Sequence, residues 1–203
     1  MVIQWLSQNY IEVLGALTGL IYLYFSIKRI IWLWPLGIIT SLLYIYVFYE
    51  AKFYADMSLQ VYYFFISIYG WYHWLFGKEK NVKKDKGEQI PIATIGIRYW
   101  LILISITIIL TVITGYILQR YTDSPLPYWD AFTTSGSVVA TWMLARKMLE
   151  NWLFWIVLDL VSMGMYIYKG LVPTVILFLV YSSMAIIGYF QWKKDMIKQN
   201  TIS

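Results

Sequence analysis

The sequence predicts an all-α integral membrane protein with seven transmembrane helices, arranged as two similar three-helix units joined by one extra helix. Three observations predict this fold: the composition, seven long apolar runs, and a repeat at a spacing of 118 residues. Of the 203 residues, 60% are hydrophobic and only 13% are charged. Since a soluble domain carries about 25% charged residues, this composition is typical of a polytopic membrane protein.

Seven apolar runs are each close to the length of about 20 residues that a helix needs to cross the hydrocarbon core. They are predicted at Ile11–Ile27, Ile31–Tyr49, Met57–Phe76, Arg98–Leu118, Ala131–Leu149, Trp152–Tyr168 and Val172–Trp192. The connection Gly77–Gln89 is polar and rich in lysine, which is typical of a solvated loop. We therefore predict a first three-helix bundle at 1–76, a loop plus linker helix at 77–130, and a second bundle with a basic C-terminal tail at 131–203.

The distribution of basic residues predicts which end of the bundle faces the cytoplasm. The first cation is Lys28, so the N-terminus lacks the basic start of a cleavable signal, and the first apolar run should remain as a helix. With seven helices, 13 of the 16 Lys and Arg residues fall in the loops after the first, third and fifth helices and in the C-terminal tail. Because such loops stay in the cytoplasm, the N-terminus is predicted outside and the C-terminus inside. The net charge of +5 then requires no nucleic-acid partner.

A gapless shift of 118 residues aligns the two predicted units. It places Lys28-Arg29 on Arg146-Lys147, Trp34 on Trp152, Tyr63 on Tyr181, Gly70 on Gly188 and Trp74 on Trp192. A three-helix unit begins and ends on opposite sides of the membrane, so a directly joined copy would be inverted. The linking helix restores the orientation and makes the repeats parallel, a plan in which transporters bind their substrate near the membrane midplane.

Polar and aromatic side chains form one stripe on the sixth predicted helix. Trp152, Trp155, Asp159, Ser162 and Tyr166 are spaced 3, 4, 3 and 4 residues apart, which places them on one face. A carboxylate at the bilayer centre costs about 2.5–3.5 kcal/mol on insertion scales, so Asp159 should face a wet cavity or a partner. The two indoles could hold a flat ring, and the carboxylate would favour a cationic ring. Alternatively, the indoles form an interface belt, which suits Trp152 equally well, and neighbouring side chains donate hydrogen bonds to Asp159.

The second and third predicted helices repeat this spacing. Their stripes are Trp34, Gly37, Ser41, Tyr44 and Phe48, with Thr40 beside them, and Gln60, Tyr63, Ser67, Gly70 and Trp74. The amide of Gln60 can donate and accept hydrogen bonds, so within the membrane it should bind another helix or a ligand. Gly37 could make room for a ring, although ordinary packing of small residues between helices explains it as well. The predicted substrate-binding residues are Trp34, Thr40, Ser41, Gln60, Tyr63, Trp152, Trp155, Asp159 and Ser162.

Several kinds of chemistry lack the residues that they need. The absence of cysteine excludes disulfides and thiolate metal sites, and a single histidine, His73, leaves little scope for a metal centre. The sequence has no Walker-type glycine loop, no paired carboxylates and no serine–histidine set, so neither ATP-driven transport nor an enzyme is expected. No cofactor or metal is predicted, and the remaining chemistry is that of binding a small molecule.

Two long segments resemble the Pnu family of vitamin transporters, best known for nicotinamide riboside transport. They are WLWPLGIITSLLYIYVFYEAKFYADMSLQVYYFFISIYGWYHW in the first unit and LPYWDAFTTSGSVVATWMLARKMLENWLFWIVLDLVSMGMYIYKGL in the second. The resemblance implies a helix arrangement like that of the sugar-transporting SWEET proteins, usually as a homotrimer in the bacterial inner membrane. It also implies facilitated diffusion, which becomes effectively one-way because a cytoplasmic kinase phosphorylates the nucleoside and traps it.

The resemblance also implies roles for individual residues. Trp152 and Trp155 are similar to the aromatic pair that holds the ring in this family. Gln60 is similar to the ligand-binding residue of the family's Leu-Gln element, and Thr40 to a hydroxyl group near the sugar.

The identity of the vitamin stays open at this point. Where an asparagine is expected in nicotinamide riboside carriers, this chain has Asp159 and Ser162. Related members carry thiamine or riboflavin, and both thiamine and nicotinamide riboside are cations with flat rings. The intact Tyr-Ala-Asp…Leu-Gln element favours nicotinamide riboside. A membrane sensor or scaffold that transports nothing is the alternative in another class.

Overall fold

The computed structural model describes residues 10–50, 54–77 and 90–202, and these form seven α-helices. The helices are α2 (Tyr10–Ile27), α3 (Leu33–Glu50), α4 (Tyr54–Phe76), α5 (Ile97–Tyr121), α6 (Pro127–Ala145), α7 (Asn151–Tyr168) and α8 (Val172–Ile202). Within the described residues the only β-type pairing is an isolated bridge between Ala93 and Met148. The predicted all-α chain with seven helices is therefore confirmed. The lysine-rich segment predicted as a loop lies, after Gly77, outside the described residues.

Two helices depart furthest from their predicted ranges. The predicted helix Ala131–Leu149 is wrong at both ends, since α6 begins at Pro127, where proline suits a first helical position, and ends at Ala145. It ends there because Lys147 adopts a left-handed backbone with φ of 52°, which breaks the helix. The helix predicted to end at Trp192 continues to Ile202, because the Lys, Gln and Met residues that follow are good helix formers.

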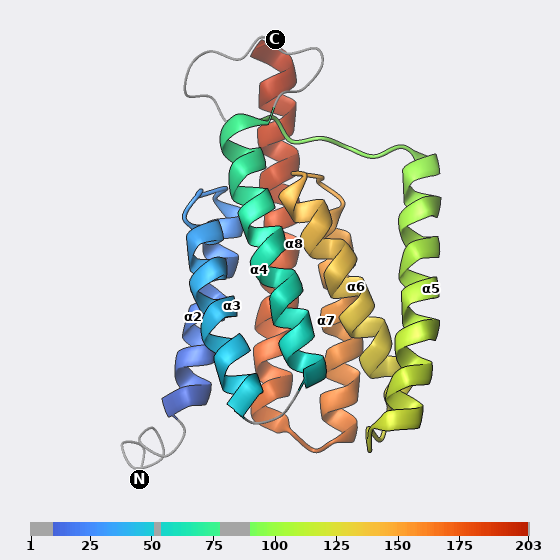
Figure 1. Ribbon diagram of the computed structural model, residues 1–203. Coiled ribbons are helices and arrows are strands. Elements are labelled where there is room, and N and C mark those ends of the chain that lie inside the picture. The colour runs from blue at the N-terminus through green and yellow to red at the C-terminus, as the bar shows by residue number, and fades with distance from the viewer. Residues whose placement is uncertain (1–9, 51–53, 78–89, 203) are drawn as a thin grey trace.

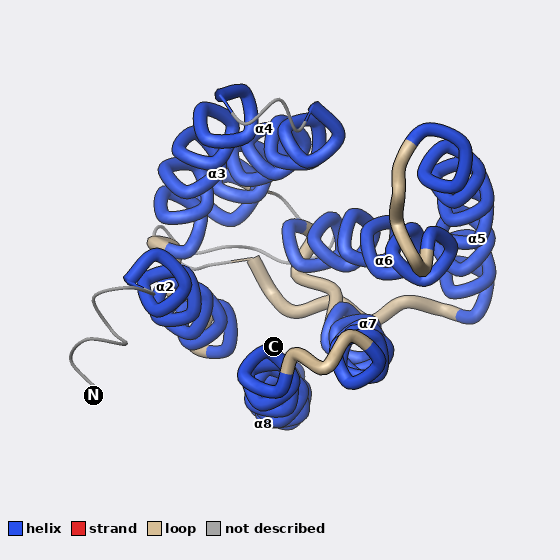
Figure 2. Tube along the Cα trace, turned by 90° about the horizontal axis from the view of Figure 1, so that it is seen from below, coloured by secondary structure: helices blue, strands red, loops and turns tan. Residues whose placement is uncertain are grey.

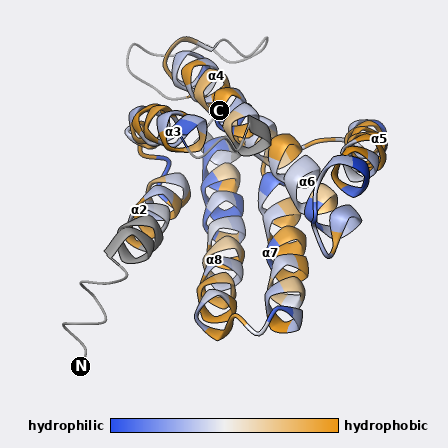
Figure 3. Ribbon diagram, turned by 60° about the horizontal axis from the view of Figure 1, so that its bottom comes forward, coloured by the Kyte–Doolittle hydropathy of each residue, from blue (hydrophilic) through white to orange (hydrophobic). Residues whose placement is uncertain are grey.

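The outer surface of the bundle is apolar. Four helical segments are long and apolar enough to cross a membrane, and they are Leu33–Glu50, Ile97–Tyr121, Asn151–Tyr168 and Val172–Gln199. The most apolar is α5, whose best window has a mean hydropathy of 2.6 and which Figure 3 shows as largely hydrophobic. Many large apolar side chains on the helices are exposed, and so large an apolar surface requires lipid. The chain is a multi-pass membrane protein.

The helices form two groups that meet along two contacts (Figures 1 and 2). Within the groups, α3 packs against α4, and α7 packs against α8 and α6. Between the groups, α2 packs against α8 and α4 packs against α6. The first helix of each three-helix unit thus contacts the last helix of the other. Helix α5 lies at the edge of the bundle and packs mainly against α6, while its Trp100 stacks on Phe154 of α7 with ring centroids 5.6 Å apart.

The turns that follow α2 and α6 have the same backbone structure. Each holds a basic residue in the left-handed region, Arg29 with φ of 55° and Lys147 with φ of 52°. Each turn also has the pair of hydrogen bonds of a Schellman motif, which satisfies carbonyls at a helix end. The bonds are Arg29 N to Ser26 O and Ile30 N to Phe25 O in the first turn, and Lys147 N to Leu144 O and Met148 N to Met143 O in the second. Because a left-handed non-glycine residue is uncommon, two of them 118 residues apart support the predicted repeat.

Each three-helix unit also packs a tryptophan on a glycine of its third helix. The two clusters are Trp34, Gly70 and Trp74 in the first unit, and Trp152, Gly188 and Trp192 in the second. A Cβ atom on the glycine would lie 2.5 Å from the first indole of its cluster in the first unit and 2.7 Å in the second. The two indoles of each cluster meet edge-on, with ring centroids 5.3 Å and 5.6 Å apart. The division into 1–76, 77–130 and 131–203 stays a prediction, and α6 begins before residue 131.

The four indoles lie at one end of the bundle, which we call the basic end. It is the end at which α2, α4 and α6 finish, and its turns contain Lys28, Arg29, Arg146 and Lys147. The indoles are at most 1% exposed, and a Trp74–Trp192 contact with centroids 6.3 Å apart joins the two clusters. The core of the protein is therefore thickest at the basic end.

Candidate functional site

Two cavities lie inside the bundle, between the two groups of helices. Their volumes are about 290 Å³ and about 410 Å³. Both are lined by Gly19, Tyr22, Tyr63 and Trp155, so they are two lobes of one site. We call the first the amide lobe, because Gln60 lines it, and the second the acid lobe, because Asp159 lines it.

The two lobes use the same six positions of the two three-helix units. From α3 and α4, the amide lobe has Gly37, Ser41, Tyr44, Gln60, Tyr63 and Ser67. From α7 and α8, the acid lobe has Trp155, Asp159, Ser162, Phe178, Tyr181 and Ala185. Each residue of the second set lies 118 positions after its counterpart in the first. The two halves therefore turn the same faces inward with different chemistry: an amide and hydroxyl groups in one, and an indole, a carboxylate and further rings in the other.

Helices α2 and α6 complete the lining with hydroxyl groups. Tyr22 of α2 lines both lobes, Thr133 and Ser137 of α6 line the acid lobe, and Thr141 lines the amide lobe. The hydroxyl group of Thr141 donates a hydrogen bond to the backbone carbonyl of Ser137 at 2.7 Å. Sequence reasoning missed these residues, although the four-residue spacing of Thr133, Ser137 and Thr141 marks one helix face.

Asp159 is buried in the wall of the acid lobe, with 6% of its surface exposed. In the part of the chain that the structure describes, no side chain forms an ion pair or hydrogen bond with its carboxylate. Trp155, one helical turn away on the same face of α7, is only partly buried and lines both lobes. An uncompensated carboxylate is costly inside a protein, so the lobe favours a ligand that brings positive charge or hydrogen-bond donors.

The structure brings eight of the nine predicted site residues to the lobes. Thr40, Ser41, Gln60 and Tyr63 line the amide lobe, and Trp152, Trp155, Asp159 and Ser162 line the acid lobe. Trp152 is 1% exposed, so most of its indole is packed away from the lobe. Trp34 lines neither lobe and lies fully buried among the indoles of the basic end. The roles of these residues in binding stay predictions.

The acid lobe extends from one end of the bundle towards the other. Tyr166, near the end of α7, lines the lobe at the end opposite the basic end. Ser26 and Leu144, near the ends of α2 and α6, line it at the basic end. Ser26 and Leu144 are each 2% exposed, so the lobe is closed at the basic end. The buried indoles of the basic end therefore form the floor of the acid lobe, against which a ligand would rest.

A lobed cavity between the halves of a membrane-spanning bundle, with a few hydrogen-bonding groups, an indole and an acid in its wall, is the site of a small-molecule transporter. The chain belongs to the nicotinamide mononucleotide transporter family, whose model matches residues 9–194. The resemblance to a vitamin transporter family is thereby confirmed.

Individual relatives are distant but similar over most of their length. The nicotinamide riboside transporter PnuC of Escherichia coli is 23% identical over 91% of this chain and 85% of its own. The riboflavin/roseoflavin transporter RibM of Streptomyces davaonensis is 26% identical over 89% of this chain and 83% of its own. A crystal structure of the vitamin B3 transporter PnuC is similar with a TM-score of 0.72 at 23% identity, and covers 97% of this chain and 86% of that one. The structural likeness shows a shared fold.

Proposed function

We propose that this chain is a uniporter that brings nicotinamide riboside into the cytoplasm by facilitated diffusion. The observation that carries the proposal is the lobed cavity, in which the unpaired carboxylate of Asp159 lies on one side and the amide of Gln60 on the other. Nicotinamide riboside joins a flat cationic ring to a hydroxylated sugar, so its two parts match the chemistry of the two lobes. The name of the Escherichia coli relative supports the same substrate.

In the proposed binding mode the ring stacks on Trp155, with Trp152 beside it and the carboxylate of Asp159 close to the positive charge. A cation and an aromatic face attract each other by about 0.5–2 kcal/mol, depending on how far the pair is desolvated. The sugar hydroxyls and the carboxamide need donors and acceptors in the wall. The residues proposed for those bonds are Thr40, Ser41, Gln60, Tyr63 and Ser162.

In the proposed transport cycle the two three-helix units rock around the bound vitamin, as parallel repeats do in other transporters. The basic end faces the cytoplasm of a bacterium, because loops rich in Lys and Arg stay on that side of the inner membrane. A cytoplasmic kinase phosphorylates the vitamin and thereby keeps the flux inward. The protein assembles as a homotrimer, an assignment that rests on the family resemblance alone.

The test of this function is the binding and uptake of nicotinamide riboside by the variant Trp155→Ala. Stacking on an aromatic face is worth about 1–3 kcal/mol, which corresponds to a dissociation constant about 5 to 150 times higher. The matched control is Trp71→Ala, because Trp71 is a tryptophan of α4 that is 38% exposed and lines neither lobe. Calorimetry gives the affinity, and uptake into sealed liposomes separates a transporter from a sensor or scaffold. Equal affinities of the two variants would contradict the assigned site.

A second candidate substrate is riboflavin, and the relative RibM, at 26% identity, favours it. Riboflavin carries no positive charge, whereas nicotinamide riboside and thiamine are cations. The variant Asp159→Asn should therefore weaken binding of both cations and leave riboflavin binding unchanged. A thermal-shift series with the three vitamins identifies the substrate, because a ligand that binds the folded state stabilises it according to its concentration relative to its dissociation constant.

A further inference from the structure

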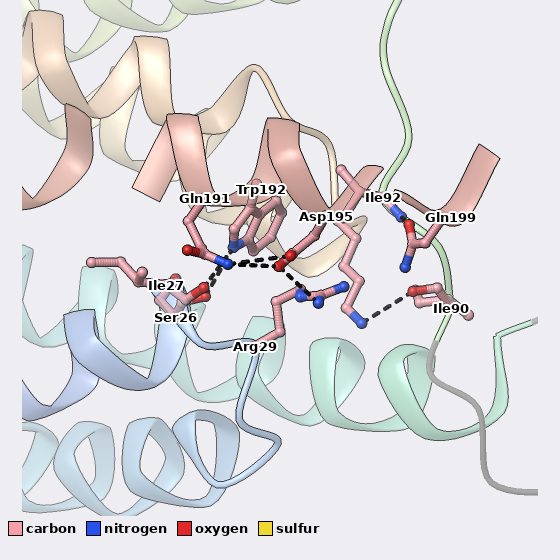
Figure 4. A network of polar contacts seen from close by, with 10 residues as sticks. Ser26, Ile27, Arg29, Ile90, Ile92, Gln191, Trp192, Asp195 and Gln199 are labelled. Atoms are coloured by element: carbon pink, nitrogen blue, oxygen red, sulfur yellow. Dashed lines mark hydrogen bonds and ion pairs between the residues drawn. The ribbon is translucent and has the colours of Figure 1, made fainter. Parts of the chain in front are cut away.

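At the basic end, each three-helix unit extends a cationic side chain to the last helix of the other unit. Arg29, from the turn after α2, donates a hydrogen bond through Nη2 to Oδ2 of Asp195 in α8, at 2.9 Å (Figure 4). Lys147, from the turn after α6, places Nζ 4.3 Å from the ring centroid of Trp74 in α4. Arg29 and Lys147 are the left-handed residues of equivalent turns. Each unit therefore makes the same kind of contact, from the turn after its first helix to the last helix of the other unit.

The Arg29–Asp195 pair is held in a partly buried setting. The two side chains are 22% and 16% exposed, so salt screens the pair less than a pair in open water. The side-chain amide of Gln191 also donates to both carboxylate oxygens of Asp195, at 3.2 Å each, and fixes the orientation of the carboxylate (Figure 4). If the pair breaks, the carboxylate of Asp195 therefore keeps its orientation but loses its positively charged partner.

A second bond between α8 and α2 lies directly beside the floor of the acid lobe. The indole nitrogen of Trp192 donates to the backbone carbonyls of Ser26 and Ile27, at 3.2 Å each (Figure 4). These are carbonyls of the last turn of α2, and that of Ser26 also accepts the hydrogen bond from the Arg29 amide in the turn. Since Ser26 lines the acid lobe, separating α8 from α2 at this point would open the lobe at the basic end.

Lys147 forms the matching contact on the other side and is 0% exposed. A buried ammonium group requires partners, and it donates to the backbone carbonyl of Ile90 at 3.1 Å in addition to its contact with Trp74. The backbone on either side is paired as well: the amide of Ala93 donates to the carbonyl of Lys147 at 3.0 Å, and the amide of Leu149 donates to the carbonyl of Ala93 at 2.9 Å. These bonds hold residues 90–93, in the segment that leads to α5, across the basic end.

We propose that Arg29–Asp195 and Lys147–Trp74 are reciprocal latches that hold the basic end closed, so that the cavity opens to that side only when both contacts break. Rocking of the two units must separate α2 from α8 and α4 from α6, and each latch spans one of these two junctions. The cargo of such a gate rests on the function proposed above, whereas the closure itself is independent of the substrate.

The absence of cysteine provides a direct test of the Arg29–Asp195 latch. In the variant Ser26→Cys, a membrane-impermeant thiol reagent added on the face that carries the C-terminus reaches the thiol only when the basic end opens. With no vitamin present, Arg29→Asp and Asp195→Arg should each raise the labelling rate by about three- to tenfold, the range of coupling expected for a partly buried pair. Aspartate tolerates the left-handed backbone at position 29. The double variant, which restores the pair with reversed charges, should return the rate towards that of the parent.

The matched control is Lys28→Gln, which removes the adjacent exposed cation and should leave the labelling rate unchanged. Parental labelling in the single variants, or a double variant labelled as fast as the singles, would overturn the proposal. If Arg29→Asp does not fold, Asp195→Asn with Arg29 intact should give the same rise, and parental labelling there would overturn it equally. If the variants show the expected labelling rates but the protein binds no vitamin, the proposed function is refuted and the proposed gate is still supported.

Discussion

The glycine under Trp152 allows a quantitative test of the packing at the basic end. In the variant Gly188→Ala the new Cβ would lie 2.7 Å from atoms of the indole, which is closer than van der Waals contact allows. The indole cannot yield easily, because it is rigid, 1% exposed and edge-on to Trp192. Overpacking of this kind costs about 1–3 kcal/mol. For a chain of this size that lowers the midpoint of thermal unfolding by about 2–12 °C.

The assay is thermal unfolding in detergent, with the variant Gly164→Ala as control. Gly164 lies inside α7, and a Cβ added there would meet nothing within 4 Å. The same substitution should therefore stabilise the protein by about 0.5–1 kcal/mol, because alanine is the better helix former. The two glycine variants are expected to shift the midpoint in opposite directions.

A shift of the same sign in both variants would refute the reasoning, because helix propensity would then outweigh the contact. Gly70→Ala tests the same contact in the first three-helix unit, since its Cβ would lie 2.5 Å from Trp34. If Gly188→Ala destabilises the protein and Gly70→Ala does not, the two clusters are not equivalent in energy.

Two further predictions concern polar groups that join the two halves of the molecule or neighbouring segments at the basic end. Burial raises the pKa of Glu150 above its ordinary 4.5, and the hydrogen bond from the Ile95 amide partly opposes the rise. Its stabilising contribution is therefore complete at pH values below that ordinary pKa and is lost as pH rises through the raised one. Glu150→Gln keeps the acceptor, so its melting temperature should exceed that of the parent at about pH 8 and equal it at about pH 4. Tyr62 donates its hydroxyl hydrogen to the carbonyl of Val138 at 2.7 Å, and Tyr62→Phe should cost about 0.5–1.5 kcal/mol in chemical denaturation. No change in the second case would mean that water replaces the bond.

Residue spacing was sufficient to predict most of the part of the cavity wall that α3, α4 and α7 contribute. The stripe of α7 and its counterparts on α3 and α4 run in steps of three and four residues, and such steps fix one helix face without knowledge of the fold. Trp34 was assigned to the site because it begins such a stripe, yet it lies among the packed indoles. Whether an indole at the start of a stripe faces the cavity or a neighbouring glycine depends on the register between helices, which one helix does not reveal.

The end of α6 and the hydroxyl groups of α2 and α6 were harder to predict for a related reason. Lys147 ends α6 in a left-handed conformation without the glycine or asparagine that normally signals one. The inward rotation of Tyr22 and Ser137 depends on the packing of α2 against α8 and of α6 against α4. These are contacts between residues far apart in the chain, and local patterns do not encode them.

The indole nitrogen of Trp74 gives the two sides of the basic end different mechanical properties. Trp192 bonds two carbonyls with its indole nitrogen, whereas that of Trp74 is buried and has no acceptor among the described residues. A directional bond breaks over a fraction of an ångström, while a charge above an aromatic face keeps most of its attraction as it slides. The contact between Lys147 and Trp74 therefore tolerates a sideways shift that would break the two hydrogen bonds of Trp192.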